Sequence, residues 1–245
     1  VHIKTLKRTE LTGGARINFI FREIFGQALR DINPLSGFSR STLLTAIRNS
    51  SGVKSTIFIP DRCFELLVKR QIKKLESPSL RCAQLVFDEM EKHIDNCGHT
   101  INSQLRRFPK LRQRIISTLL EMLKIRIEIT NDMIHQLINI HTAYINTAHP
   151  DFIVQNRQYN ITHSTELCTV DYHNQSRNIV TFEGGEQIPN ENSDDYVSYQ
   201  CLIVERLIMS YFNIIRTAIE DTVPKTIMLL FRNNIAENLQ SELVD

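Results

Sequence analysis

The sequence predicts an all-α protein, an elongated antiparallel four-helix bundle with a polar, disordered insertion. Glycine (8) and proline (7) are scarce among 245 residues, and 42% of the residues are hydrophobic, which is typical of a folded chain with few turns. Apolar residues recur three and four positions apart over three long stretches, as they do in helices that bury one face. Between the second and third stretches this period disappears.

The first long stretch runs from Pro60 to Ile94, and proline suits the first position of a helix. Pro78 should kink this rod without ending it, because the apolar stripe resumes at once. Gly98 then fits the left-handed stop that often follows a helix. The stripe consists of Phe64, Leu67, Val68, Leu75, Leu80, Ala83, Phe87, Met90 and Ile94.

The second stretch runs from Pro109 to His149. Thr130, Asn131 and Asp132 can cap a new helix, so we expect a break near Glu128. The residues expected in the core are Leu111, Ile115, Leu119, Leu123, Met133, Leu137, Ile138, Tyr144 and Ile145.

The last helix is expected from about Tyr199 to Leu243, with a bend at Pro224. At 1.5 Å per residue it would be about 65 Å long, so it needs partners of similar length. Residues 1–49 supply a weaker fourth helical part. The expected division is therefore 1–153 with three helical segments, 154–198 as the variable insertion, which is rich in Asn, Ser, Thr, Glu and Asp, and 199–245 as the closing helix.

Bulk properties exclude several classes of protein. The formal net charge is only +2, which argues against a nucleic-acid binder with a dominant basic face. The five cysteines are scattered, as expected of reduced thiols in the cytosol. No apolar run approaches the length of a membrane span, and no signal peptide is recognisable. The first residue is Val and the end is abrupt, so we expect a piece of a longer protein.

No motif predicts catalysis. Gly52 to Ser55 lacks the glycine spacing of a phosphate-binding loop. His93, Cys97 and His99 have no second pair of ligands, as structural zinc requires. We therefore expect no catalytic, cofactor or metal site in these residues, and the chain is predicted to be a scaffold.

Four strings resemble the middle region and the GTPase-effector region of dynamin-related proteins. They are GGARI from Gly13, FELLVKRQIKKLESPSLRC from Phe64, AYINTAHPDF from Ala143, and SYFNIIRTAIEDTVPKTIM from Ser210, with QSELV near the end. They occur in the family's order and cover nearly the whole chain outside the insertion. The second string is most similar to the mitochondrial and peroxisomal fission subclass, with the vacuolar-sorting subclass close behind.

The resemblance implies the self-assembly stalk of a large GTPase that oligomerises on membranes to drive the fission of organelles or vesicles. It implies GTP and Mg for a GTPase domain upstream of these residues. It also implies a homo-oligomer (dimer, tetramer or helical filament), organelle adaptors, indirect contact with the membrane surface, and microtubules as a further partner. The implied location is the cytoplasm, with peripheral recruitment to membranes.

The same resemblance implies an assembly interface. Its expected residues are Arg16, Ala46 and the tight loop of Gly52, Val53, Lys54 and Ser55. The alternatives are an ordinary surface charge for Arg16 and close packing for Ala46. His141 stands where fission-type relatives usually carry an acidic residue, which puts a salt bridge there in doubt.

Other functions stay open at this stage. They are a vacuolar-sorting or endocytic relative, an antiviral Mx-like stalk, and an adaptor-binding module in which the polar insertion recruits partners.

Overall fold

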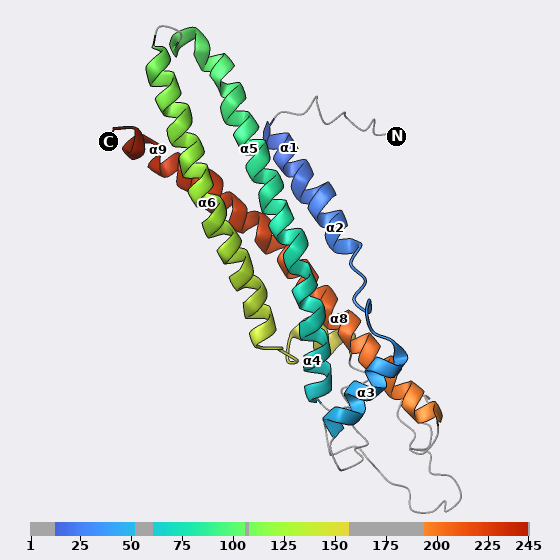
Figure 1. Ribbon diagram of the computed structural model, residues 1–245. Helices are drawn as coiled ribbons and strands as arrows, with labels where there is room; N and C mark the ends of the chain where they lie inside the picture. Colours follow the sequence, from blue (N-terminus) through green and yellow to red (C-terminus); the bar gives the residue numbers. More distant parts are fainter. Residues whose placement is uncertain (1–12, 52–60, 106–107, 157–193, 245) are drawn as a thin grey trace, which may run out of the picture. The chain divides into compact units, whose positions relative to one another are not determined.

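The computed structural model describes residues 13–51, 61–105, 108–156 and 194–244 (Figure 1). These residues form helices joined by short connections, without a strand among them, so the all-α prediction is confirmed. The elements are α1 (Gly13–Phe19), a π-helical turn (Ile20–Phe25), α2 (Gly26–Arg30), α3 (Arg40–Ser51), α4 (Asp61–Ile72), a 3-10 turn (Lys73–Leu75), α5 (Glu76–Leu105), α6 (Pro109–Ala143), α7 (Pro150–Gln155), α8 (Asp194–Ile227), a second π-helical turn (Met228–Asn233) and α9 (Asn234–Val244).

The chain divides into two compact units. Unit 1 comprises residues 1–32, 73–141 and 216–245, and unit 2 comprises residues 33–72 and 142–215. The helical run from α4 to α5 and the long helix α8 each contribute residues to both units.

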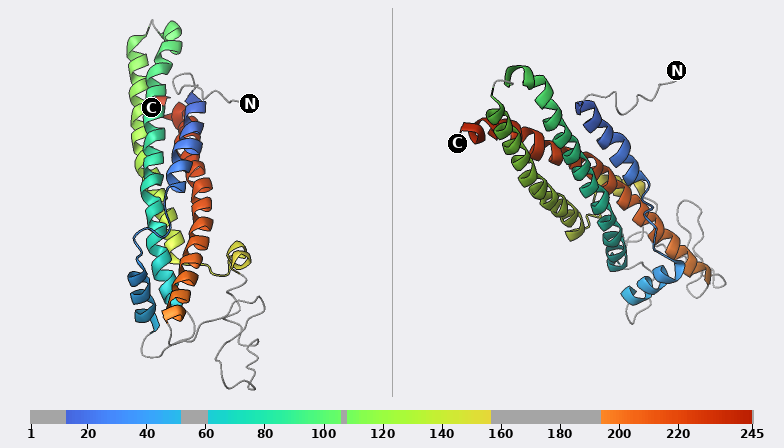
Figure 2. Two further views of the ribbon diagram at one scale, coloured as in Figure 1. Left: turned by 90° about the vertical axis from the view of Figure 1, so that its right-hand side faces the viewer. Right: turned by 45° about the horizontal axis from the view of Figure 1, so that its top comes forward.

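In unit 1, α5 and α6 form a hairpin and lie side by side in every view (Figures 1 and 2). His135 near the end of α6 pairs with Glu76 at the start of α5, which fixes the antiparallel direction. Arg30 at the end of α2 lies 3.4 Å from Glu220 of α8. Unit 1 therefore brings together helices from the beginning, the middle and the end of the chain.

The first helical segment of unit 1 stays buried along one face despite an irregular spacing. Gly13, Ile20, Phe25 and Leu29 are buried, and the step from Ile20 to Phe25 is five residues where an α-helix uses three or four. The π-helical turn spans these same residues. Because a π turn bonds residues five apart, it absorbs the extra residue and keeps the apolar side chains on one face.

Unit 2 is centred on three aromatic rings. Phe64 of α4 stacks on Phe152 of α7 at 5.7 Å between ring centroids. Tyr211 of α8 meets both rings edge-on, at 5.9 and 5.4 Å. The Tyr211 hydroxyl also accepts a hydrogen bond of 2.9 Å from the backbone N–H of Asn146, which ties the connection between α6 and α7 to α8.

Two expected helix boundaries are wrong. Gly98 lies inside α5, because a single interior glycine costs only about 1 kcal/mol and does not by itself end a helix. Thr130 lies inside a continuous α6. Its hydroxyl donates to the Arg126 carbonyl at 2.7 Å, one turn back in the same helix, and it does not cap a new one.

Two prolines, Pro78 and Pro224, lie inside helices. Pro78, where a kink was expected, lies in the first turn of α5, directly after the 3-10 turn. Pro224 lies within α8, and the second π-helical turn begins four residues later. In both cases the helical run continues past the proline.

Candidate assembly surface

Helix α6 carries an apolar stripe that the described residues of unit 1 leave exposed. Ile125, Ile129, Met133 and Ile140 are 53%, 40%, 39% and 63% exposed. Their spacing of four, four and seven residues places them on one side of the helix. We call these four residues the α6 stripe. From Ile125 to Ile140, a distance of 15 residue steps, it extends about 22 Å along the helix.

The α6 stripe is distinct from the face that α6 buries. Leu123, Ile134 and Ile138 are at most 2% exposed and belong to the core of unit 1. Helix α6 is therefore apolar on two sides, one packed and one open to solvent. A helix that is apolar beyond its packed face is typical of a surface that another molecule covers.

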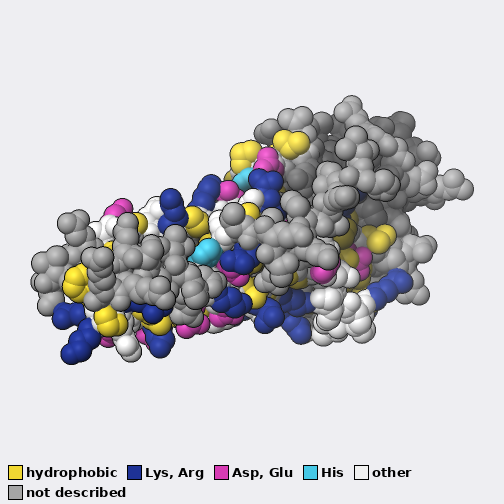
Figure 3. Space-filling view, turned by 90° about the horizontal axis from the view of Figure 1, so that it is seen from above, with side chains coloured by type: hydrophobic (Ala, Val, Ile, Leu, Met, Phe, Trp, Pro, Cys, Tyr) yellow, Lys and Arg dark blue, Asp and Glu magenta, His cyan; other side chains and the backbone are white. Residues whose placement is uncertain are grey.

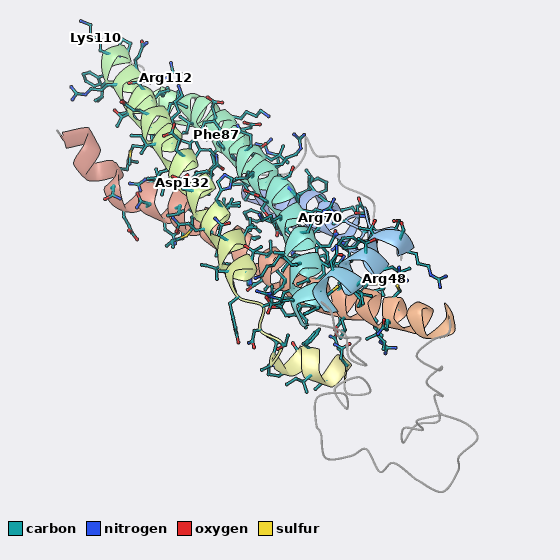
Figure 4. All side chains as sticks on the ribbon, turned by 60° about the horizontal axis from the view of Figure 1, so that its bottom comes forward. Arg48, Arg70, Phe87, Lys110, Arg112 and Asp132 are labelled. Carbon is teal, nitrogen blue, oxygen red and sulfur yellow. The ribbon has the colours of Figure 1, made fainter. Side chains whose placement is uncertain are left out.

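Acidic side chains border the α6 stripe along one margin. Glu121, Glu128 and Asp132 are exposed, and their helical spacing puts them beside the apolar residues. Asp132 is labelled on α6 in Figure 4. Elsewhere, on the face drawn in Figure 3, acidic and basic side chains are interspersed.

Three residues that the apolar pattern predicted for the core are exposed. Met133 was expected in the core, together with Leu111 and Tyr144, yet the three are 39%, 49% and 72% exposed. The expectation held for Leu123, Ile138 and Ile145, which are buried. The spacing of the apolar residues identified α6 as an amphipathic helix. However, apolar residues cover so much of this helix that only the positions of the neighbouring helices show which of them are buried.

Arg16 of α1 lies inside unit 1. Its Nε approaches Glu89 Oε1 of α5 to 2.5 Å, without the alignment of a hydrogen bond. The Glu89 side chain is 5% exposed and that of Arg16 is 24% exposed. Arg16 therefore neutralises a buried carboxylate in its own unit, and only a small part of it reaches the surface.

Ala46 lies in unit 2, on α3. It is half-buried, next to the buried Ile47. Gly52, Val53, Lys54 and Ser55 lie outside the described residues, as does most of the expected insertion.

Burial shifts the pKa of several side chains among the described residues. Burial raises the pKa of the Cys63 thiol to about 11 and that of Cys82 to about 12, so both stay protonated at neutral pH. Burial lowers the pKa of His141, which favours the neutral imidazole there.

Among the described residues no cluster of His, Cys, Asp and Glu is arranged to hold a metal ion. None of the helices in these ranges combines the length and apolar character needed to cross a bilayer.

Comparison with known proteins identifies the family. Residues 3–161 match the dynamin central region, and residues 196–245 match the dynamin GTPase effector domain. The chain belongs to the dynamin family. The two matches leave residues 162–195 uncovered, which lie within the expected insertion 154–198.

Relatives agree with this membership. The chain is 36% identical to a dynamin-1-like protein of Danio rerio, over 98% of this chain and 42% of the relative. It is 34% identical to the dynamin-1-like protein of Caenorhabditis elegans, over 98% and 43% of the two chains. It is 30% identical to a dynamin-related protein of Saccharomyces cerevisiae, over 96% and 42%. The chain thus spans less than half the length of these relatives.

Proposed function

We propose that this chain is the self-assembly stalk of a dynamin-like large GTPase that oligomerises on membranes and drives the fission of organelles or vesicles. The observation that carries the proposal is the α6 stripe, an exposed apolar surface on a helix whose other side is already packed. Membership of the dynamin family and the matched effector domain support a GTPase as the parent protein. GTP and Mg²⁺ then belong to the parent protein, and recruitment to the membrane is peripheral, through adaptors.

The α6 stripe is the proposed dimer contact. Replacing Ile129 with Glu places a charge in the middle of the stripe, where association would bury it at a cost of several kcal/mol. In sedimentation velocity over a concentration series, we expect the 245-residue chain to self-associate and Ile129→Glu to remain a monomer. Circular dichroism checks that the variant is folded. We expect it to be folded, because Ile129 is exposed and the substitution does not disturb the core.

Lys124→Glu is the matched control. Lys124 is exposed on the same helix, outside the stripe, so the same introduced charge should leave association unchanged. Self-association of Ile129→Glu at the wild-type concentration would disprove the α6 contact, as would a wild-type chain that stays monomeric throughout.

The loop Gly52–Ser55 is proposed as a second contact, which joins dimers into larger assemblies. Lys54→Glu should reduce species larger than the dimer and leave the dimer in place, measured in the same sedimentation series. Arg16→Glu is a poor test, because it would leave Glu89 buried beside a second negative charge. An unchanged distribution of species for Lys54→Glu would refute this assignment.

A further inference from the structure

An open groove crosses unit 1, where the first helical segment contacts the start of α5 (Figure 1). Its volume is about 360 Å³, which is within the usual size of a site for a small molecule. From the first helical segment, Ile24, Phe25 and Ala28 line the groove. It shares no residue with the α6 stripe, so a ligand in the groove would leave the proposed dimer contact uncovered.

The side of the groove that α5 forms is also largely apolar. Pro78, Cys82 and Leu85 line it. Cys82 is 2% exposed, and burial raises the pKa of its thiol to about 12, so this side chain is uncharged at neutral pH. The groove therefore offers a continuous apolar surface to the tail of a ligand.

Two polar side chains of α5 can hold one negative charge at this groove. Ser77 and Arg81 both line it, and their spacing of four residues puts them on the same face of the helix. Both are exposed, and neither side chain has an ion pair or a hydrogen bond with another described residue. Lys74 also lines the groove, but it already has an interaction partner. The guanidinium of Arg81 and the hydroxyl of Ser77 are therefore the donors that a ligand can meet.

No acidic residue is among the described residues that line the groove. Glu76, which precedes Ser77, pairs with His135 on α6. Glu23, which precedes Ile24, is exposed and does not line the groove. An apolar surface with one positive charge at its edge is complementary to an apolar ligand with one anionic group.

The length of the apolar surface indicates the size of this ligand. Pro78 and Leu85 are seven positions apart, which is about 10 Å along the helix axis. With C–C bonds of about 1.5 Å in a zigzag, an extended chain of about eight to ten carbons covers this length. We propose that the groove binds a free fatty acid of medium chain length, with its carboxylate on Arg81 and Ser77 and its alkyl chain along the apolar residues. This binding does not depend on self-assembly.

The test measures displacement of a fluorescent fatty acid, dansylaminoundecanoic acid, from the 245-residue chain. Its emission should rise saturably as the dansyl group leaves water, and decanoic acid should displace it. Decanol should displace it about tenfold more weakly, because an alcohol makes no charge-assisted contact with Arg81. Hexanoic acid should also be at least about tenfold weaker than decanoic acid, because it buries four fewer methylene groups.

Variants of the chain locate the ligand. Arg81→Gln should weaken decanoic acid about tenfold and leave decanol unchanged, so the preference for the acid disappears. Ala28→Trp fills the groove and should weaken both ligands at least about tenfold. Arg114→Gln removes an exposed arginine of unit 1 outside the groove, and it should bind both ligands like the wild type.

Several results would overturn the proposal. They are the absence of saturable binding of the probe, equal displacement by decanoic acid and decanol in the wild type, and an equal loss of binding in Arg81→Gln and Arg114→Gln. If Ala28→Trp does not fold, the comparison of acid and alcohol in Arg81→Gln decides the question. Binding to phosphatidylserine vesicles without displacement of the probe by decanoic acid would also overturn it, in favour of a membrane surface.

Discussion

At the scale of single residues, Gly13 and Gly14 are adjacent in α1 but have opposite surroundings. A Cβ on Gly13 would lie 1.1 Å from Nε2 of His93 on α5. That nitrogen is buried without a hydrogen-bond partner. A Cβ on Gly14 would meet nothing within 4 Å. The first glycine is needed for the close approach of two helices, and the second is not.

We therefore expect Gly13→Ala to lower the free energy of unfolding by about 1–3 kcal/mol, the usual cost of overpacking. Gly14→Ala should raise it by up to about 1 kcal/mol, because alanine favours the helix. Urea denaturation followed by circular dichroism measures both. The double variant Gly13→Ala/His93→Ala should recover part of the loss. Equal stability of the two single variants would contradict the packing of His93 on Gly13.

The partner of Arg16 could not be predicted from the sequence. Arg16 belongs to the string GGARI, which resembles the family, but its partner Glu89 lies 73 residues away on another helix. Only the packing of α1 on α5 brings the two side chains together. Arg16 was expected to be either an assembly residue or a surface charge. The structure shows a third role, in which Arg16 pairs with a buried carboxylate.

At the scale of elements, α4, α7 and α8 meet in unit 2 through Phe64, Phe152 and Tyr211. The Tyr211 hydroxyl connects this cluster to the segment between α6 and α7, because it accepts a hydrogen bond from the backbone N–H of Asn146. Burial raises the pKa of Tyr211, and the hydrogen bond from the Asn146 backbone opposes that rise. The hydroxyl is therefore protonated at neutral pH, and its oxygen accepts the bond.

Tyr211→Phe should lower the free energy of unfolding by about 1–2 kcal/mol, because the half-buried N–H of Asn146 loses its partner. Tyr144→Phe removes the same hydroxyl from a side chain that is 72% exposed, and it should change stability by less than about 0.5 kcal/mol. Chemical denaturation measures the stability, and hydrogen exchange at Asn146 reports the local effect. Unchanged exchange at Asn146 in Tyr211→Phe would rule out this link between the elements.

The elements also show why some boundaries were predictable. The spacing of apolar residues located α4 to α6 and α8, because a helix that buries one face must repeat with its own period. It could not show that α6 continues through Thr130, since the same hydroxyl can cap a helix or bond within one. Nor could it distinguish Leu123, which is buried, from Ile129, which is exposed, because both are aliphatic and only the surrounding helices differ.

At the scale of the whole molecule, the all-α class and the family were both available from the sequence. Long ordered strings such as Phe64–Cys82 identified the family, and the matches to residues 3–161 and 196–245 agree with them. The division into two units was not predicted, because α8 and the run from α4 to α5 are continuous in the sequence and cross from one unit to the other.

The π-helical turn Ile20–Phe25 has a consequence for how this protein can change during evolution. Deleting one residue between Ile20 and Phe25 would reduce the step between them to four and turn the segment into an ordinary α-helix. The residues on either side would keep their places in the core. Homologues could therefore gain or lose this π-helical turn through a change in chain length alone, with every buried side chain conserved.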